Sequence, residues 1–158
     1  MRSKTLASTA AVVAIGVAGC GGTGSGLGSA AHRAAVPASG RRPTQIFAVR
    51  MSGTTELTAG ARHGVGAAVI AFHGASTICW RFAHLHGFTN ATSAQINEGV
   101  ARHVGQTVIV LSAGPRLHHQ GCVPVSPALT KRIVARPAGY SVTIRSEQYP
   151  QGAVRAQL

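Results

Sequence analysis

The chain has 158 residues, of which 45% are apolar and only 4% aromatic, so its core must be built mainly from Val, Ile, Leu and Ala. Fifteen Lys and Arg residues stand against three Glu and no Asp, which is a formal net charge of +12. Such a charge attracts anionic lipid head groups or acidic wall polymers through a salt-dependent field. The shortage of stacking aromatic side chains argues against specific nucleic-acid binding, and the lack of a recognisable acid–base pair argues against hydrolysis.

The first twenty residues have the pattern of an export signal. Residues 1–4 supply a basic start, and residues 6–17 form an Ala/Val/Ile-rich run that suits a secretory signal but is too short to span a bilayer. The sequence Val-Ala-Gly-Cys at residues 17–20 is similar to the lipobox of a bacterial lipoprotein. The resemblance implies cleavage before Cys20, a lipid on that cysteine and a mature chain tethered outside the cytoplasmic membrane.

Composition divides the rest of the chain into a linker and a domain. Gly, Ser, Ala and Pro dominate residues 20–44, which favours a flexible linker that buries too little apolar surface to fold. Residues 1–19 are therefore the predicted signal peptide, residues 20–44 the linker and residues 45–158 one folded domain.

Short apolar runs bounded by Gly, Pro, Ser or Asn predict β-strands in this domain. There are seven of them, at residues 46–51, 66–72, 77–85, 93–96, 107–111, 140–144 and 153–158. One short helix interrupts them after Ser126, which stands in N-cap position before Pro127, and Pro137 ends it. The pattern predicts an all-β fold, an antiparallel Greek-key-like β-sandwich of about seven strands with this helix across one end.

The cysteine count predicts a disulfide. If Cys20 carries lipid, Cys79 and Cys122 remain as an even pair in an oxidising compartment. A bridge between them would close a loop of about 44 residues and stabilise the domain by roughly 4 kcal/mol. The alternative is two free reactive thiols.

Three short motifs follow one another along the domain: MSGTTE at residues 51–56, AQINEG at 94–99 and PQGAVRAQL at 150–158. In their order and spacing they resemble the L-x-G-x-x-E, A-H-I-H-x-G and P-x-G-E-I-R-G-Q-L of the CHRD domain, a family named for chordin and common in bacterial exported proteins. The resemblance covers most of residues 46–158. It supports the fold but implies no function, because the family has no settled activity.

The chain departs from the family at positions that matter for chemistry. Gln95 and Asn97 stand where the family usually has the two histidines of A-H-I-H, and Arg145 and Ser146 stand where it usually has His-Thr. We therefore expect no metal or proton-transfer site built from those histidines.

Of the eight histidines, His84 and His86 are the strongest metal-ligand candidates, because residues i and i+2 of a strand point to the same face. A third ligand would come from one of three histidines in predicted loops: His103, His118 or His119. The structural alternative is that a regular strand places both at the end of its core-facing row. The apolar residues of the same parity are Ile78, Trp80 and Phe82.

These observations predict a lipid-anchored, extracytoplasmic module with a non-catalytic binding or adhesion role at the cell envelope. Its predicted partners are the membrane, through the lipid, and an anionic polymer or lipid; no cofactor or metal is predicted. The alternative is a metal-dependent or redox enzyme that uses His84 and His86.

Glu98 is expected to cap a turn or pair with an arginine, and Arg155 to form an ion pair or clamp a carbonyl. Arginines on the solvent side of strands would also explain the charge without any partner.

Overall fold

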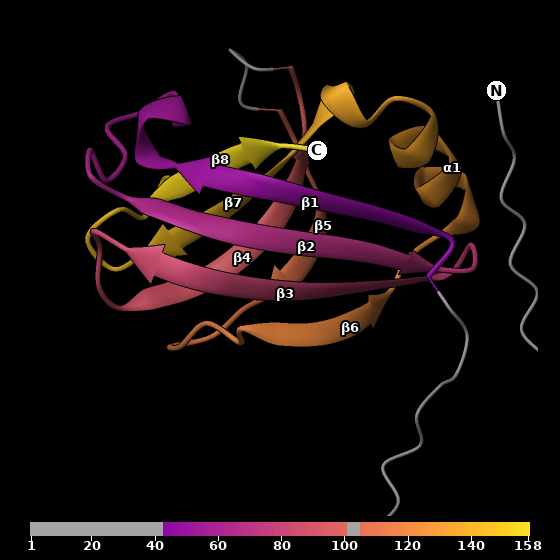
Figure 1. Cartoon of the computed structure of the whole chain (residues 1–158), viewed down its shortest axis with the longest axis horizontal. Helices are drawn as coiled ribbons and strands as arrows, with labels where there is room; N and C mark the ends of the chain where they lie inside the picture. The colour runs from indigo at the N-terminus through magenta and orange to yellow at the C-terminus, as the bar shows by residue number, and fades with distance from the viewer. Residues whose placement is uncertain (1–42, 101–104) are drawn as a thin grey trace, which may run out of the picture. The chain divides into compact units, whose positions relative to one another are not determined.

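The structure is a computed structural model that describes residues 43–100 and 105–158 (Figure 1). The predicted signal peptide, Cys20, nearly all of the predicted linker and His103 lie outside the described residues. The strands are β1 (Gln45–Ser52), β2 (Val65–His73), β3 (Thr77–His86), β4 (Ala91–Glu98), β5 (Thr107–Ser112), β6 (Gln120–Pro124), β7 (Tyr140–Ser146) and β8 (Val154–Gln157). The helices are α1 (Pro127–Ala135) and two short 3-10 turns, η1 (Gly53–Thr55) and η2 (Pro137–Gly139).

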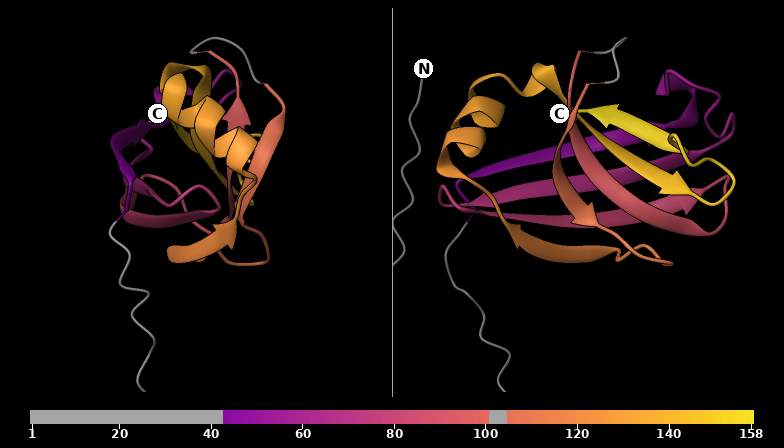
Figure 2. Two further views of the ribbon diagram at one scale, coloured as in Figure 1. Left: turned by 90° about the vertical axis from the view of Figure 1, so that its right-hand side faces the viewer. Right: turned by 180° about the vertical axis from the view of Figure 1, so that it is seen from behind.

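All eight strands belong to one antiparallel sheet with the order β5-β4-β7-β8-β1-β2-β3-β6. The sheet curls until it is nearly closed, as the two turned views show (Figure 2). The all-β prediction is confirmed, but the sheet is barrel-like rather than a sandwich. The reason is that β1 pairs with β2 along its whole length and also with β8, through Ser52 and Arg155, so that no gap separates two sheets.

The eighth strand, β6, was not among the predicted strands. Its sequence, QGCVP, contains a glycine and a proline and has no apolar run. It is a strand because it pairs with β3, from Thr77 opposite Pro124 to Arg81 opposite Gln120. Pro124 is tolerated because β6 is an edge strand.

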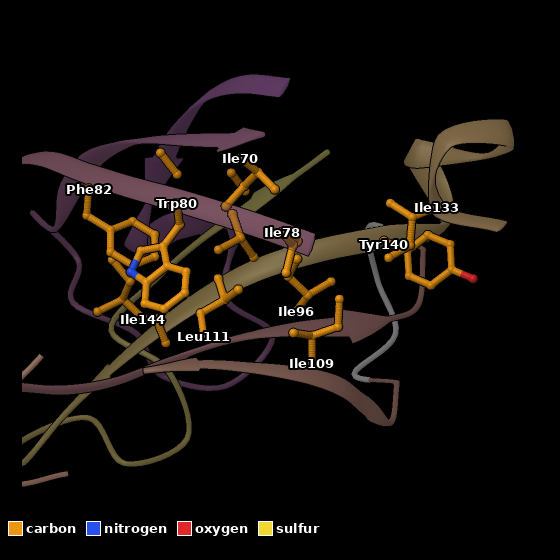
Figure 3. Close-up of a cluster of buried hydrophobic side chains, with 14 of the residues drawn as sticks. Ile70, Ile78, Trp80, Phe82, Ile96, Ile109, Leu111, Ile133, Tyr140 and Ile144 are labelled. Atoms are coloured by element: carbon orange, nitrogen blue, oxygen red, sulfur yellow. The ribbon is translucent and has the colours of Figure 1, made fainter. Parts of the chain in front are cut away.

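The apolar core lies inside the curled sheet and uses alternate residues of every long strand. Ile70, Ile78 and Trp80 meet Ile96, Ile144 and Leu111 across it (Figure 3). Most of the core is aliphatic, as the composition predicts. The Trp80 indole lies over Gly121 of β6, where a Cβ would be 2.6 Å from Cζ2, and its Nε1 donates a hydrogen bond to the His118 carbonyl at 3.0 Å.

Helix α1 has the ends that the sequence predicts. The Ser126 side chain accepts a hydrogen bond from the Leu129 amide at 3.2 Å, Pro127 occupies the first turn, and Pro137 follows the C-cap. Leu129 and Ile133 are buried against the core, so the helix covers one end of the barrel (Figure 1). Within the described residues, no helix is long and apolar enough to cross a membrane.

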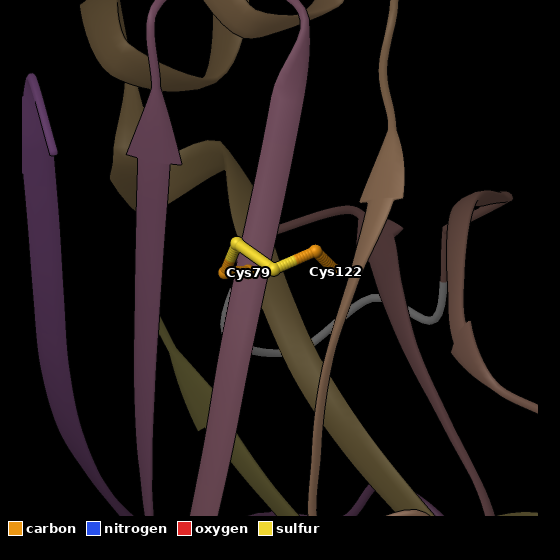
Figure 4. Close-up of a disulfide and its surroundings, with 2 residues drawn as sticks. All are labelled: Cys79 and Cys122. Carbon is orange, nitrogen blue, oxygen red and sulfur yellow. A yellow bond between two sulfur atoms is a disulfide. The ribbon is translucent and has the colours of Figure 1, made fainter. Parts of the chain in front are cut away.

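Cys79 and Cys122 form a disulfide, as the cysteine count predicts (Figure 4). The two residues are directly opposite each other in the pairing of β3 with β6, with Cα atoms 4.0 Å apart. Alternation with the buried Ile78 and Trp80 directs Cys79 away from the core, and Cys122 is exposed. The bridge therefore ties an edge strand to the rest of the sheet from the outside.

Candidate functional site

Three neighbouring strands bury polar side chains on the face opposite the apolar core. Gln95 of β4, Thr143 of β7 and Arg155 of β8 stand side by side in the strand register. Each alternates with core residues, so the three point outward from the barrel. They are nevertheless only 8%, 3% and 3% exposed, respectively. A buried polar row on the outside of a sheet requires a cover.

Loop residues supply that cover and enclose a small pocket. Its floor is the polar row together with Asn97 and Arg145, and its rim includes Glu56, Thr58 and Gln151. The volume is about 40 Å³, which is room for about three to four water-sized groups, since a water needs roughly 10–15 Å³ of such space. We call this the polar pocket: Glu56, Thr58, Gln95, Asn97, Thr143, Arg145, Gln151 and Arg155.

Asn97 holds the floor of the polar pocket together by hydrogen bonds. Its Oδ1 accepts from Gln95 Nε2 at 3.0 Å and from the Thr107 hydroxyl at 2.9 Å. Its Nδ2 donates to the Thr143 hydroxyl oxygen at 3.4 Å. Because buried amides are costly unless they are paired, this network orients the floor residues before any ligand arrives.

The turn after β1 places Glu56 over this floor. Its backbone amide donates to the Gly53 carbonyl, and the Thr55 hydroxyl donates to the Arg155 carbonyl at 2.7 Å, which ties the turn to β8. The Glu56 carboxylate packs on Gly152, where a Cβ would lie 2.5 Å from the carboxylate carbon. The two sequence motifs at residues 51–56 and 150–158 thus meet at this carboxylate.

Burial raises the pKa of Glu56 to about 7, and the positive charges of Arg155 and Arg145 only partly oppose that rise. Among the described residues, Oε1 of Glu56 and Nε of Arg145 are buried atoms without a hydrogen-bond partner. The polar pocket therefore combines two guanidinium groups, one carboxyl group that titrates near neutral pH, and neutral amides and hydroxyls. This donor set suits hydrogen bonding and anion recognition, and it does not suit a metal ion.

Replacing Glu56 by glutamine should flatten the pH dependence of stability. The folded-state pKa lies above the ordinary value of 4.5, so the protonated carboxyl favours the fold. Its contribution is complete below about pH 4.5 and is lost as pH rises through about 7. Denaturant unfolding at pH 5 and pH 8 should show a smaller loss of stability for Glu56→Gln than for the parent. The control, Glu147→Gln at an exposed position, should keep the parent's slope; equal slopes for all three proteins would contradict the assignment.

His84 and His86 do not lie in the core-facing row, and the expectation from a regular strand is wrong. Val65 of β2 pairs with His86, but Ala67 pairs with Ala83, so β3 contains one extra residue at this point. His84 has the positive φ of 54° that such a bulge accommodates. The bulge reverses the alternation: Leu85 packs against the core, and both histidines are exposed.

The other predicted metal ligands do not join them. His118 and His119 are exposed residues before β6, and their carbonyls accept hydrogen bonds from Trp80 and Phe82. In the described part of the chain, no group of three or more His, Cys, Asp or Glu side chains is placed to hold a metal ion.

Arg155 and Glu98, the two charged residues with predicted structural roles, each have a hydrogen-bond partner. Arg155 donates from Nη2 to the Val100 carbonyl at 3.5 Å, which agrees with the predicted carbonyl clamp. Glu98 accepts a hydrogen bond from the Tyr140 hydroxyl at 3.3 Å, a partner that was not predicted.

Sequence reasoning singled out most members of the polar pocket but did not bring them together. Gln95, Asn97 and Arg145 were noted as departures from the family, and Glu56 and Arg155 as motif residues. Alternating polar and apolar residues in β4 are typical of any strand with one solvated face. The one available signal was that the departures and the C-terminal motif place polar residues at strand positions opposite the core, while the first motif places Glu56 in the turn after β1.

Comparison with known proteins identifies the family. The sequence model of the CHRD domain matches residues 47–158, which include the whole polar pocket and both cysteines of the disulfide. Neither curated proteins nor solved structures produced a significant match. The match covers most of the chain, and the motifs that carry it meet in space at Glu56, Gly152 and Arg155. This chain therefore belongs to the CHRD domain family.

Proposed function

We propose that this protein is a non-catalytic binding module of the cell envelope, tethered by a lipid on Cys20, that adheres to anionic lipid or wall polymer through its surface charge. The observation that carries this proposal is the sign of the exposed charge. Within the described residues, the exposed acids are Glu98 and Glu147 alone. The exposed bases there are Arg50, Arg62, Arg81, Arg116, Lys131, Arg132 and Arg136.

Three of these bases lie on helix α1 or at its C-cap, at one end of the barrel. Lys131 and Arg132 are neighbours on α1, and Arg136 is the C-cap residue four positions after Arg132, on the same side of the helix. This helix is therefore the part of the surface that we expect to contribute most to contact with an anionic layer. The disulfide supports an oxidising compartment outside the cytoplasm.

The alternative of a metal-dependent or redox enzyme that uses His84 and His86 gains no support from the described residues. Both side chains are exposed beside a bulge, and no third His, Cys, Asp or Glu of the described chain completes a ligand set with them. The only disulfide of the described residues is a cross-strand link on the outer face of the sheet, and no further cysteine stands beside it for exchange.

Binding to anionic vesicles tests the adhesion directly. The mature chain, residues 20–158, with Cys20→Ser so that it cannot carry the lipid, should bind phosphatidylglycerol vesicles at low salt and should not bind phosphatidylcholine vesicles. Raising the salt toward 1 M should weaken binding by about tenfold or more, because the screening length falls to roughly 3 Å. Replacing Lys131, Arg132 and Arg136 by glutamine should cost about 1 kcal/mol for each base near the surface, which together is on the order of a hundredfold.

The matched control replaces the exposed residues His84 and His86 by alanine and leaves every Lys and Arg in place. Vesicle binding should be unchanged in this variant. Binding that persists in high salt, or that disappears with the histidines while the helix variant binds normally, would overturn the proposal. Flotation with vesicles or sedimentation measures each case.

A further inference from the structure

We propose that the polar pocket binds the carboxylate group of a small organic acid between Arg145, Thr143 and Glu56. This goes beyond charge-driven adhesion, because the pocket is built for one small group and lies on the outer face of β4, β7 and β8 rather than on α1. The two proposals therefore fail independently: loss of one leaves the other's experiment unaffected.

The charges of the polar pocket favour an anion. Arg145 and Arg155 contribute two positive charges, and Glu56 is the only acid among its residues. A guanidinium removed from water is stabilised by an anionic partner, and Arg and carboxylate fit each other through two parallel hydrogen bonds. Arg155 is already engaged with the Val100 carbonyl, so Arg145, with its buried Nε lacking a partner among the described residues, is the group left to receive a ligand.

The hydrogen-bonding groups of the polar pocket favour a small planar ligand that accepts hydrogen bonds. The Thr143 hydroxyl oxygen already accepts from Asn97, so its proton is available for donation to a ligand oxygen. The Glu56 Oε1 has no partner within the described residues and, when protonated, donates as well. Three donors around one small space match the two oxygens of a carboxylate.

The size of the polar pocket limits what can enter. Its volume of about 40 Å³ accepts about three to four water-sized groups, whereas a site for a drug-sized ligand occupies about 300–1,000 Å³. Thr58 and Gln151 at the rim are exposed, so the remainder of the acid would extend past them toward solvent.

Protonation of Glu56 should strengthen binding of the ligand carboxylate. The Glu56 carboxyl faces Arg155 from β8, Arg145 from β7, the neutral Gln95 and Asn97 from β4, and the backbone of Gly152. When Glu56 is protonated, the two arginines give the polar pocket a net charge of +2, and a bound carboxylate lowers it to +1, the charge that the pocket has when Glu56 is ionised and no ligand is bound. When Glu56 ionises, its own charge competes with the ligand. Carboxylate affinity should therefore fall as pH rises through about 7, the pKa of Glu56.

Titration of the full chain with acetate, followed by NMR shifts of the Asn97 and Gln95 side-chain amides, tests the proposal. Acetate at pH 6 should shift these signals with saturation, while acetamide and chloride at equal concentration should not. Arg145→Gln should weaken acetate binding by about tenfold or more, the usual effect of losing a charge-assisted hydrogen bond. Arg81→Gln, which removes an exposed arginine from β3, should bind acetate as the parent does.

A second variant and two competing anions test the site even if Arg145→Gln does not fold. Glu56→Gln mimics the protonated carboxyl, so its affinity for acetate should be the same at pH 8 and at pH 6. The parent should bind acetate more weakly at pH 8 than at pH 6. Acetate shifts no larger than those of chloride, or equal binding by Arg145→Gln and the parent, would refute the site. Tighter binding of inorganic phosphate than of acetate would refute the carboxylate assignment.

Discussion

Replacing Cys79 and Cys122 together by alanine should lower the free energy of unfolding by about 4 kcal/mol, the chain-entropy value for a loop whose ends are 43 positions apart. The bridge joins β3 to the edge strand β6, whose only strand partner in the described sheet is β3. Without it, β6 is held by a short ladder and by the contact of Gly121 with Trp80. A loss of this size is a large part of the stability of a domain of this length.

Urea unfolding monitored by the fluorescence of Trp80 measures the effect, because this tryptophan is the only one in the chain. Treatment of the parent with a reductant should produce the same loss, since Cys122 is exposed and accessible. The control is Val69→Ala on the outer face of the neighbouring β2, which should change the free energy of unfolding by less than about 1 kcal/mol. A double cysteine variant as stable as this control would show that the bridge does not contribute to the free energy of unfolding.

Replacing Cys20 by serine should abolish the lipid anchor, which is the largest effect expected for the proposed function. A serine hydroxyl cannot take the thioether lipid that the lipobox-like run implies. We therefore expect a chain that is released or left unprocessed, with no lipid in its mass. Intact-mass spectrometry and separation of membranes from soluble material measure both results.

The matched control for this experiment is Ser25→Ala, five residues further along the Gly-rich segment. It alters the linker but not the cysteine, so the protein should keep its lipid and its place in the membrane. A parent protein whose mass lacks lipid would contradict the lipoprotein interpretation, and it would leave the vesicle and acetate experiments unaffected.

The positions of the seven predicted strands and of α1 could be predicted because the local signals agree with the tertiary contacts. Ser126, Pro127 and Pro137 determine the ends of the helix through hydrogen bonds and backbone geometry that involve only near neighbours. The disulfide followed from the cysteine count and the expected compartment. The family followed from short motifs whose order is a property of the sequence itself.

Other features depend on partners far along the chain. Strand β6 exists because β3 pairs with it, and the sheet closes toward a barrel because β8 reaches β1. The left-handed backbone at His84 turns two histidines to solvent, although no glycine marks that position in the sequence.

By itself, the sequence determined the β-strands, the helix ends, the cysteine pair and the strongly basic composition, because each depends on residue type or on neighbours a few positions away. Only the tertiary structure decided the face on which a polar residue lies and what covers it. Gln95, Thr143 and Arg155 lie in strands whose polar and apolar residues alternate, a pattern that usually places the polar side chains in solvent. They are buried because the turn that carries Glu56 and the loop that contains Gly152 pack near them, and this contact joins residues about 100 positions apart.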